Sequence, residues 1–101
     1  MMIYIKGSNT KKKDPRKTEA YKSFAFNLIA FIGRCQICGT SLNLQVHHVK
    51  PVRTHPELIT EKNNCLVLCS GRNQASGCHK LCGHNGDFML INPDVFKLVR
   101  F

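Results

Sequence analysis

Apolar residues recur at helical spacing in the first third of the chain. Successive members of the pattern lie three, four, three and one positions apart, which places them on one stripe of a helix. They are Tyr21, Phe24, Leu28, Phe31 and Ile32. Asp14 and Pro15 suit the helix start, because Asp caps a helix and Pro fits its first turn, and Gly33 suits its end. We therefore expect an amphipathic helix whose apolar stripe packs into the core.

Beyond this helix, apolar and polar residues alternate as they do in a half-buried strand. Leu42, Leu44 and Val46 share one side of a strand expected within residues 42–49. The short apolar run at residues 65–68 predicts a second strand. Polar residues at 51–61 and 70–77 predict loops on either side of that strand.

The C-terminal part of the chain is expected to contain shorter elements. Residues 78–81 are expected to open a short helix, and Asn92-Pro93 predicts a turn. A last strand is expected from Val95, with the apolar residues of the tail packed against the rest. Helices and strands in this order indicate a small α+β fold.

A chain of 101 residues forms one small domain, and this one contains no internal repeat and no low-complexity linker. Residues 1–13 read as a short strand-like start and a basic arm that ends in Lys11-Lys12-Lys13, so the domain spans residues 14–101. The beginning of the chain lacks the apolar stretch and small-residue cleavage site of a signal peptide. No apolar run is long enough to span a membrane, so a soluble, cytoplasmic protein is expected.

The formal net charge of +9 favours a polyanionic partner such as nucleic acid, although a basic surface alone is also compatible with simple solubility. The excess lies mainly before the cysteines begin. Residues 1–34 carry eight Lys or Arg and two Asp or Glu, a net +6, and the remainder carries seven and four, a net +3.

Six cysteines offer a way to hold so small a domain together. In a reducing compartment, paired cysteines bind metal more often than each other. Cys35-x-x-Cys38 is a strong zinc signal, and Cys69 with Cys78 forms a weaker second pair because eight residues separate them. Cys65 and Cys82 compete for this role. We interpret Cys65, in an apolar run, as a buried small residue, and Cys82 as a free thiol or packing residue. A redox role for the first pair lacks the βαβ pattern of thioredoxin-like proteins.

Four of the five histidines fall in two clusters close to these cysteines. His47 and His48 are adjacent on the first expected strand, so their side chains should point to opposite faces. One can then bind a metal while the other approaches a reaction centre from another direction. His79 and His84 form the second cluster, and His55 is interpreted as a surface or loop-fixing residue.

The ordered motifs from residue 35 to residue 84 resemble an HNH endonuclease with a four-cysteine zinc site. They are Cys35-x-x-Cys38-Gly39, Val46-His47-His48-Val49-Lys50-Pro51, Asn64-Cys65-Leu66-Val67-Leu68-Cys69 and Cys78-His79. The resemblance covers about half of the chain and implies a ββα-metal fold, also called a His-Me finger, after the N-terminal helix. Carried over by position, the resemblance implies that His48 is the general base. It implies that Asn64 fixes the loop between the strands and helps to orient the base. The catalytic metal would be held by His47, His79 and His84, and the structural zinc by Cys35, Cys38, Cys69 and Cys78.

The resemblance also implies the cofactors and the partner. A structural Zn²⁺ would accompany one catalytic divalent ion, which could be Mg²⁺, Mn²⁺, Ni²⁺ or Zn²⁺. The substrate would be DNA, nicked by a monomer or cut on both strands by a homodimer. An association with phages or mobile elements is also implied.

Two features depart from the pattern of the family. Residues 70–77 separate Cys69 from Cys78, where a short Cys-x-x-Cys-His is more usual. His79 and His84 lie five residues apart, whereas positions four apart share a face of a regular α-helix. Either the helix ends at Gly83 or a π-type turn brings His84 round.

Candidate phosphate contacts are scattered along the chain. They are Lys50, Arg53, Arg72 and Lys80, each of which is also compatible with ordinary surface charge. The basic arm at residues 1–13 would add salt-dependent affinity. The alternative function is a non-catalytic zinc module that binds nucleic acid. It needs only the four cysteines and the arm, and it leaves the histidine clusters unexplained.

Overall fold

Two antiparallel strands and one α-helix frame the part of the chain that this computed structural model describes, residues 14–72 and 76–101. The helix α1 spans Glu19–Ile32, and the strands β1 and β2 span Leu44–His48 and Cys65–Cys69. The remaining regular elements are single helical turns. The 3₁₀ turns are η1 (Pro15–Lys17), η2 (Pro56–Leu58), η3 (Lys62–Asn64) and η5 (Val95–Leu98), and η4 (His79–Gly83) is a π-helical turn. The expected α+β class is confirmed, and the basic arm at residues 1–13 lies outside the described residues.

Helix α1 starts later than Asp14-Pro15 predicts. Asp14 caps the separate turn η1, where its carboxylate accepts the Arg16 backbone N–H at 2.9 Å. Thr18 then adopts an extended backbone, and its hydroxyl accepts the Tyr21 N–H at 3.2 Å as the cap of α1. Gly33 ends the helix in the left-handed conformation, as predicted. Among the described helices, none combines the length and the apolar character needed to cross a membrane.

The apolar stripe of α1 is half-buried, and no residue of α1 is fully buried. Four of its five predicted members lie on the half-buried face, together with Ala25 and Ile29, namely Tyr21, Phe24, Leu28 and Ile32. Phe31 is 88% exposed, so the assignment of Phe31 to the core was wrong. The reason is geometric: a helix of 14 residues is about 21 Å long, and a sheet of two short strands covers only part of it.

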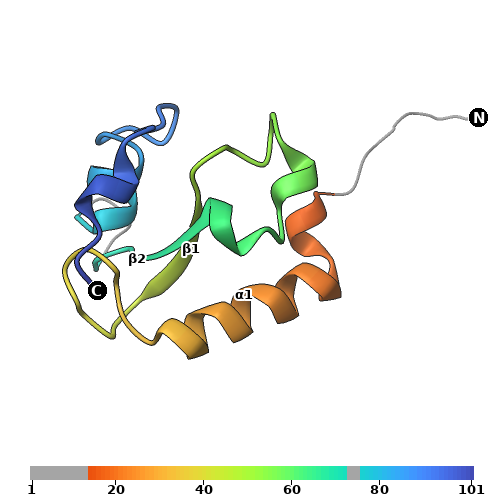
Figure 1. Cartoon of the computed structure of the whole chain (residues 1–101), viewed down its shortest axis with the longest axis horizontal. Helices are drawn as coiled ribbons and strands as arrows, with labels where there is room; N and C mark the ends of the chain where they lie inside the picture. The colour runs from red at the N-terminus through yellow and green to blue at the C-terminus, as the bar shows by residue number, and fades with distance from the viewer. Residues whose placement is uncertain (1–13, 73–75) are drawn as a thin grey trace, which may run out of the picture.

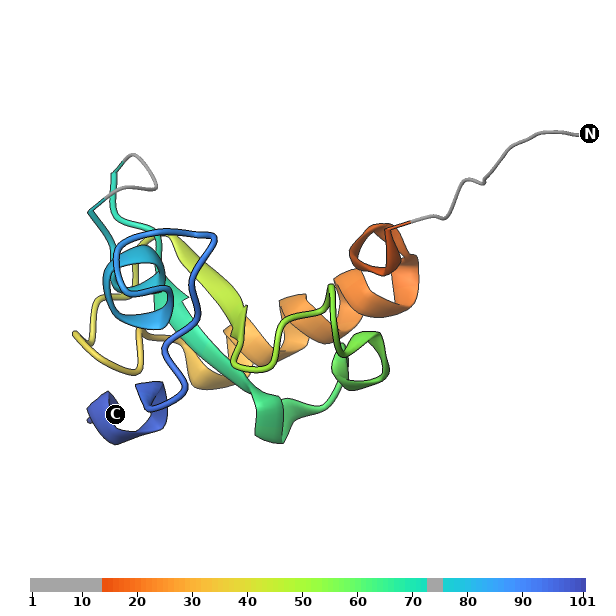
Figure 2. The ribbon, with the colours of Figure 1, turned by 90° about the horizontal axis from the view of Figure 1, so that it is seen from above.

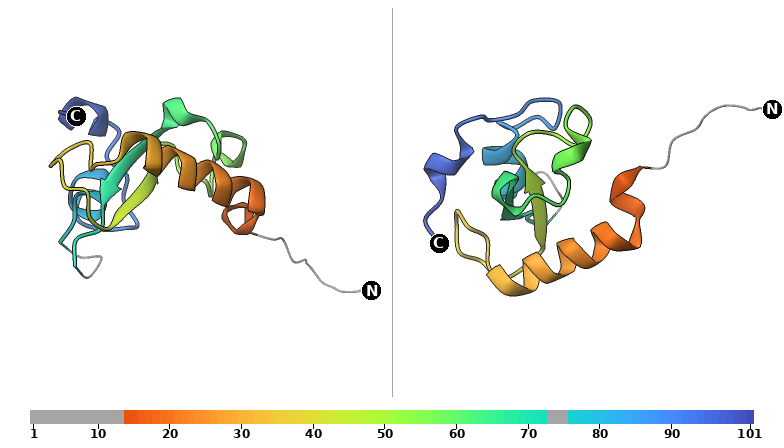
Figure 3. Two further views of the ribbon diagram at one scale, coloured as in Figure 1. Left: turned by 90° about the horizontal axis from the view of Figure 1, so that it is seen from below. Right: turned by 45° about the vertical axis from the view of Figure 1, so that its right-hand side comes forward.

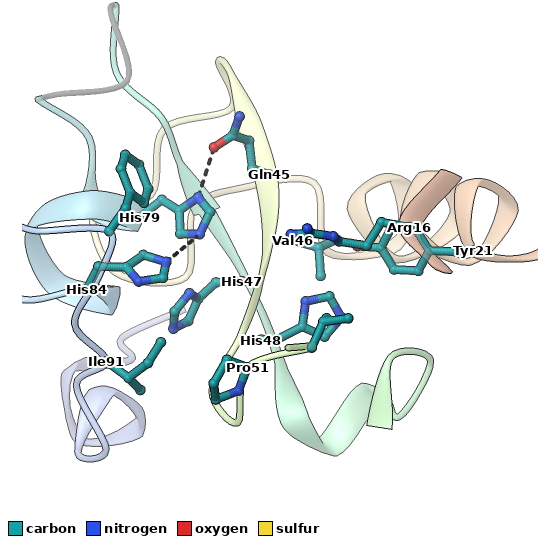
Figure 4. Close-up of a pocket in the computed structure, with 12 residues that line it drawn as sticks. Arg16, Tyr21, Gln45, Val46, His47, His48, Pro51, His79, His84 and Ile91 are labelled. Carbon is teal, nitrogen blue, oxygen red and sulfur yellow. Dashed lines mark hydrogen bonds between the residues drawn. The ribbon is translucent and has the colours of Figure 1, made fainter. Parts of the chain in front are cut away.

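The two predicted strands pair in antiparallel register, with Leu44 opposite Cys69 and His48 opposite Cys65. Figure 1 shows α1 running beside these two strands, and the C-terminal turns lie together on the side of the molecule away from the N-terminus. The views in Figures 2 and 3 agree that the long connection between the strands extends from one end of the sheet. The close-up in Figure 4 shows β1 between α1 and the π-helical turn, so the sheet has a helical element on each face.

The core is small and rich in cysteine. Its buried cluster consists of Cys35, Leu66, Leu68, Cys69 and Val95. All five residues of β2 are buried, whereas several large apolar side chains elsewhere, such as Met89 at 73% exposure, are not. So little buried apolar surface is typical of a domain that needs a metal to be stable.

The C-terminal tail does not form the expected last strand. Residues Val95–Leu98 form the 3₁₀ turn η5, and of the tail's apolar residues only Val95 is fully buried. The outer edge of β2 is already used by Gln36, whose backbone N–H donates to the Val67 carbonyl and whose Oε1 accepts the Val67 N–H. With that edge occupied, the tail instead donates its Arg100 and Phe101 N–H groups to the Gln36 carbonyl.

Leu68→Ala tests the importance of β2 for the core. Leu68 is fully buried, so we expect the substitution to lower the free energy of unfolding by about 2–5 kcal/mol. Leu42→Ala is the matched control, because Leu42 is 68% exposed and its substitution should change the free energy of unfolding little. Urea denaturation measures both, and equal losses would contradict this description of the core.

Candidate metal centres

Four cysteines from separate parts of the chain converge at one end of the sheet. Cys35 and Cys38 lie in the turn after α1, Cys69 ends β2, and Cys78 directly precedes η4. Their Sγ atoms all lie within 4.8 Å of one another, and the Sγ atoms of Cys38 and Cys69 are 3.7 Å apart. Four thiolates in such a cluster are the ligand set of a structural zinc site, so the residues present fit the ion.

Backbone N–H groups are directed at two of these sulfurs. The Cys38 N–H donates to Cys35 Sγ, and the Cys78 N–H donates to Cys69 Sγ, each at 3.4 Å. Burial raises the pKa of Cys35, but hydrogen bonds from backbone amides outweigh it and bring that pKa down to about 7. The pKa of Cys78 is raised, first by burial and then by the neighbouring thiols. The neighbouring thiols therefore oppose the ionisation of Cys78, which a bound Zn²⁺ would favour.

Gly77 explains how the long segment between Cys69 and Cys78 still permits a common site. A side chain at position 77 would overlap the backbone from Cys69 to Gly71. The two ends of the segment therefore meet backbone to backbone, and Cys78 arrives beside Cys69.

The two remaining cysteines lie outside this cluster. Cys65 is only 7% exposed and lies at the other end of β2, and burial raises its pKa to about 11. Cys82 is half-buried in η4. The structure therefore brings together the four cysteines that the sequence favoured, without either competitor.

A second cluster consists of His47, His79 and His84, which offer ring nitrogens within 4.8 Å of one another. His47 lies on β1, His79 begins η4 and His84 directly follows it. The rings form a tight group, with centroids 4.8–5.0 Å apart. Figure 4 shows the three side chains pointing toward one another from the strand and from the turn.

The hydrogen bonds of His79 and His84 leave a lone pair on each Nε2. His79 Nδ1 lies 2.8 Å from Gln45 Oε1, and His84 Nδ1 lies 2.8 Å from the Leu90 carbonyl oxygen. Both oxygens can only accept, so each Nδ1 carries the proton. The two Nε2 atoms then face each other at 3.2 Å with lone pairs and no proton between them. A cation between two such nitrogens would resolve this conflict.

The environment of His47 also favours a bound cation. Its side chain is 1% exposed, and neither ring nitrogen has a hydrogen-bond partner among the described residues. An unsatisfied buried polar group costs about 1–3 kcal/mol, which coordination of a metal would offset. Burial, and then the charges of the neighbouring histidines, lowers the pKa of His47 to about 3, so the ring is neutral at pH 7 and can act as a ligand.

The π-helical turn brings His79 and His84 to the same side despite their five-residue spacing. Its widened hydrogen-bond pattern, i to i+5, aligns positions that an α-helix would separate. Both outcomes that the sequence left open are observed, because the turn is π-helical and it also ends at Gly83. Gly83 within the turn is also required, because a Cβ there would lie 2.9 Å from His47 Cε1.

His48 points to the opposite face of the sheet. Its ring lies 5.8 Å from that of Tyr21 on α1, and Figure 4 shows it directed away from the histidine cluster. His48 Nε2 lies 2.9 Å from the Ile59 carbonyl oxygen, which can only accept, so the proton resides on Nε2 and the lone pair on Nδ1. Burial lowers the pKa of His48, so the ring is neutral at pH 7.

Asn64 closes the loop between the strands. Its Oδ1 accepts the Lys50 N–H at 2.8 Å, and its Nδ2 donates to the Lys50 carbonyl at 3.0 Å. One buried amide thus satisfies both backbone groups of Lys50, two residues after His48.

Both faces of β1 open onto one cleft. Its inner cavity, of about 450 Å³, is lined by the three clustered histidines, His48, Arg16, Tyr21 and Phe88, among others. An adjoining outer cavity, of about 570 Å³, contains Arg53 and Met89 and shares Arg16, His84 and Phe88 with the first. This cleft places the adjacent His47 and His48 along one shared space.

The four candidate phosphate contacts are distributed unevenly around the cleft. Arg53 lines its outer cavity, and Lys80 lies 5.7 Å from the ring centre of Phe88. Lys50 lines a different cavity near Pro93, and Arg72 is exposed, so neither is placed at the cleft.

Sequence reasoning missed Arg16, Gln45 and Phe88. Gln45 lies two positions before His47 in β1, and alternation along a strand was a signal that could have found it. The other two come from a turn and a loop for which the sequence carries no such signal.

Comparisons with models of protein families, with curated proteins and with solved structures gave no match to this chain. Its function is therefore inferred from its own residues and their geometry.

The cysteine cluster predicts about one tightly bound zinc per chain. Cys78→Ser should lose that zinc and unfold at lower denaturant concentration, because a structural site with three thiolates holds the ion weakly. Cys82→Ser is the matched control, since Cys82 lies outside the cluster and should keep both the zinc and the stability. Elemental analysis and urea denaturation provide the readouts, and a zinc lost equally from both variants would refute the assignment.

The histidine cluster predicts a second, weaker site for a divalent cation. Loss of one ligand in His84→Ala should reduce its affinity more than tenfold, since changes around the ligands alone reduce affinity by about 10–100-fold. Titration of the zinc-loaded protein with Co²⁺ or Ni²⁺, followed by visible absorption, measures this affinity.

His55→Ala is the control for this titration, because His55 bonds Thr54 in the loop and is not part of the cluster. Saturation of His84→Ala at wild-type metal concentrations would show that the three histidines do not form a site.

Proposed function

We propose that this protein is a metal-dependent endonuclease of the HNH type, with a ββα-metal site, that hydrolyses phosphodiester bonds in DNA. The observation that carries the proposal is the division of roles between adjacent histidines on β1. His47 joins a three-histidine cluster suited to a cation, and His48 presents a free Nδ1 lone pair on the other side of the strand. A metal ligand and a base beside one cleft are what metal-assisted hydrolysis requires.

The order of elements supports the HNH assignment over other metal hydrolases. The sequence of β1, the loop closed by Asn64, β2 and a helical turn bearing His79 matches the order of the His-Asn-His motif. The helical part is one π-helical turn, so the ββα unit proposed here is a reduced one. The four-cysteine cluster lies beside that turn, as in the zinc-containing members that the sequence resembles.

The chain's own residues would divide the work as follows. His48 accepts the proton of the attacking water at Nδ1, while its Nε2–H stays bonded to the Ile59 carbonyl and fixes the ring. Asn64 holds the Lys50 backbone and so stabilises the end of the strand that carries His48. His47, His79 and His84 would hold the divalent ion. When bound, that ion would neutralise charge on the phosphate and assist the leaving oxygen.

The electrostatics of the cleft suit a phosphodiester. No carboxylate lines the inner cavity among the described residues, and Arg16 adds a positive charge beside His48. The net charge of +9 supports association with a polyanion. An anionic substrate is thus favoured by the charges that face the cleft.

His48→Ala should reduce cleavage of plasmid DNA by about 10²–10⁴-fold, because a positioned general base contributes roughly that factor. Gel assays with Mg²⁺, Mn²⁺ or Ni²⁺ would measure nicked and linear products. His55→Ala should cleave like the wild type, and His48→Ala should still bind the second metal.

Equal cleavage by wild type and His48→Ala would remove His48 from the role of base. Binding of DNA without cleavage under any of these metals, together with an empty histidine cluster, would instead support the non-catalytic zinc module.

A further inference from the structure

Arg16 stands out because it lines both cavities of the cleft. It lies in η1, before α1, and Figure 4 shows its side chain reaching from that turn toward β1 and the ring of His48. The histidine cluster lies on the other side of the same strand. A phosphate in the cleft would therefore have a cation site on one side and a guanidinium on the other.

The guanidinium is held in a fixed orientation by Asp14. Its Nε and Nη2 donate to the two carboxylate oxygens of Asp14, each at 3.2 Å. A guanidinium has five N–H groups, so three remain after these two bonds. The side chain is 57% exposed, which leaves those donors accessible to a ligand. Asp14 thus orients Arg16 without using up its capacity to bind.

The charges around the two cavities favour an anion that extends through both. Arg53 adds a second guanidinium in the outer cavity. The one carboxylate that lines either cavity among the described residues is Asp14, and it is already paired with Arg16. The positive charge of Arg16 therefore lies where the two cavities meet, and that of Arg53 lies in the outer cavity.

We propose that Arg16 binds a phosphate of a DNA strand that lies along the cleft from the inner to the outer cavity. This inference rests on the proposed function and deepens it, because it names a residue that would contact the strand. Arg16 acts as a substrate-binding residue through its three free N–H groups, which can form paired hydrogen bonds with phosphate oxygens. The neighbouring Lys17, which is exposed and lines neither cavity, takes no part.

The experiment measures binding of fluorescent duplex DNA by anisotropy at several salt concentrations. The protein is the zinc-loaded full chain carrying His48→Ala, so that cleavage does not interfere. Adding Arg16→Ala should weaken binding about tenfold, the usual effect of losing a hydrogen bond to a charged group. The slope of log affinity against log salt should also fall by about one.

Two matched variants make the test specific. Lys17→Ala removes one positive charge from the same turn and should change the affinity and the slope much less. Arg16→Lys keeps the charge but loses the planar fork, so it should retain the salt slope and bind with intermediate affinity. Zinc content and circular dichroism of each variant establish that it is folded.

The outcomes separate this inference from the proposed function. Equal losses in Arg16→Ala and Lys17→Ala would overturn the inference, even if the wild type cleaves DNA. Specific loss in Arg16→Ala would uphold it, even if no metal supports cleavage, in which case the proposed hydrolysis alone fails.

Discussion

Convergence of four thiols at one end of the hairpin is the interaction on which the rest of the structure depends. The buried apolar cluster is small, and two of its five members, Cys35 and Cys69, are themselves part of the thiol site. Structural zinc contributes about 10–16 kcal/mol to the folding of zinc-finger peptides, as much as the whole stability of an ordinary domain. A bound zinc would therefore supply the folding stability that other domains gain from a larger apolar core.

The thiol site also determines where the histidines meet. Cys69 ends β2 and Cys78 directly precedes the π-helical turn, so joining them places that turn against the sheet. His79 begins the turn and Gly83 closes it onto the ring of His47. A disturbance of the cysteines would thus reach the second site by rigid packing and not through any shared ligand.

The sequence predicted the two strands and the Cys35–Cys38 pair from local signals, and alternation placed His47 and His48 on opposite faces. The rest of the two candidate ligand sets followed from the resemblance of the ordered motifs, because the spacings of Cys69 with Cys78 and of His79 with His84 were unfavourable. The errors concern long-range packing. Phe31 fits the helical period but is 88% exposed beside a sheet of only two strands, and the β2 edge that the tail from Val95 would need is already bonded to Gln36. Neither fact is encoded in a short stretch of residues.

The same limit explains why the role of α1 changed most between sequence and structure. A sheet of two strands leaves no residue of the helix fully buried, and Tyr21 in its first turn lines the cleft together with Arg16 of η1. Strand geometry requires a covering element on this side: because His47 faces the π-helical turn, His48 must face the other side of the sheet. Tyr21 and Arg16 of the preceding turn lie on that side and line the cleft with His48. The start of the N-terminal helix and the turn before it therefore belong to the candidate site, although the motifs that predicted this site begin only at Cys35.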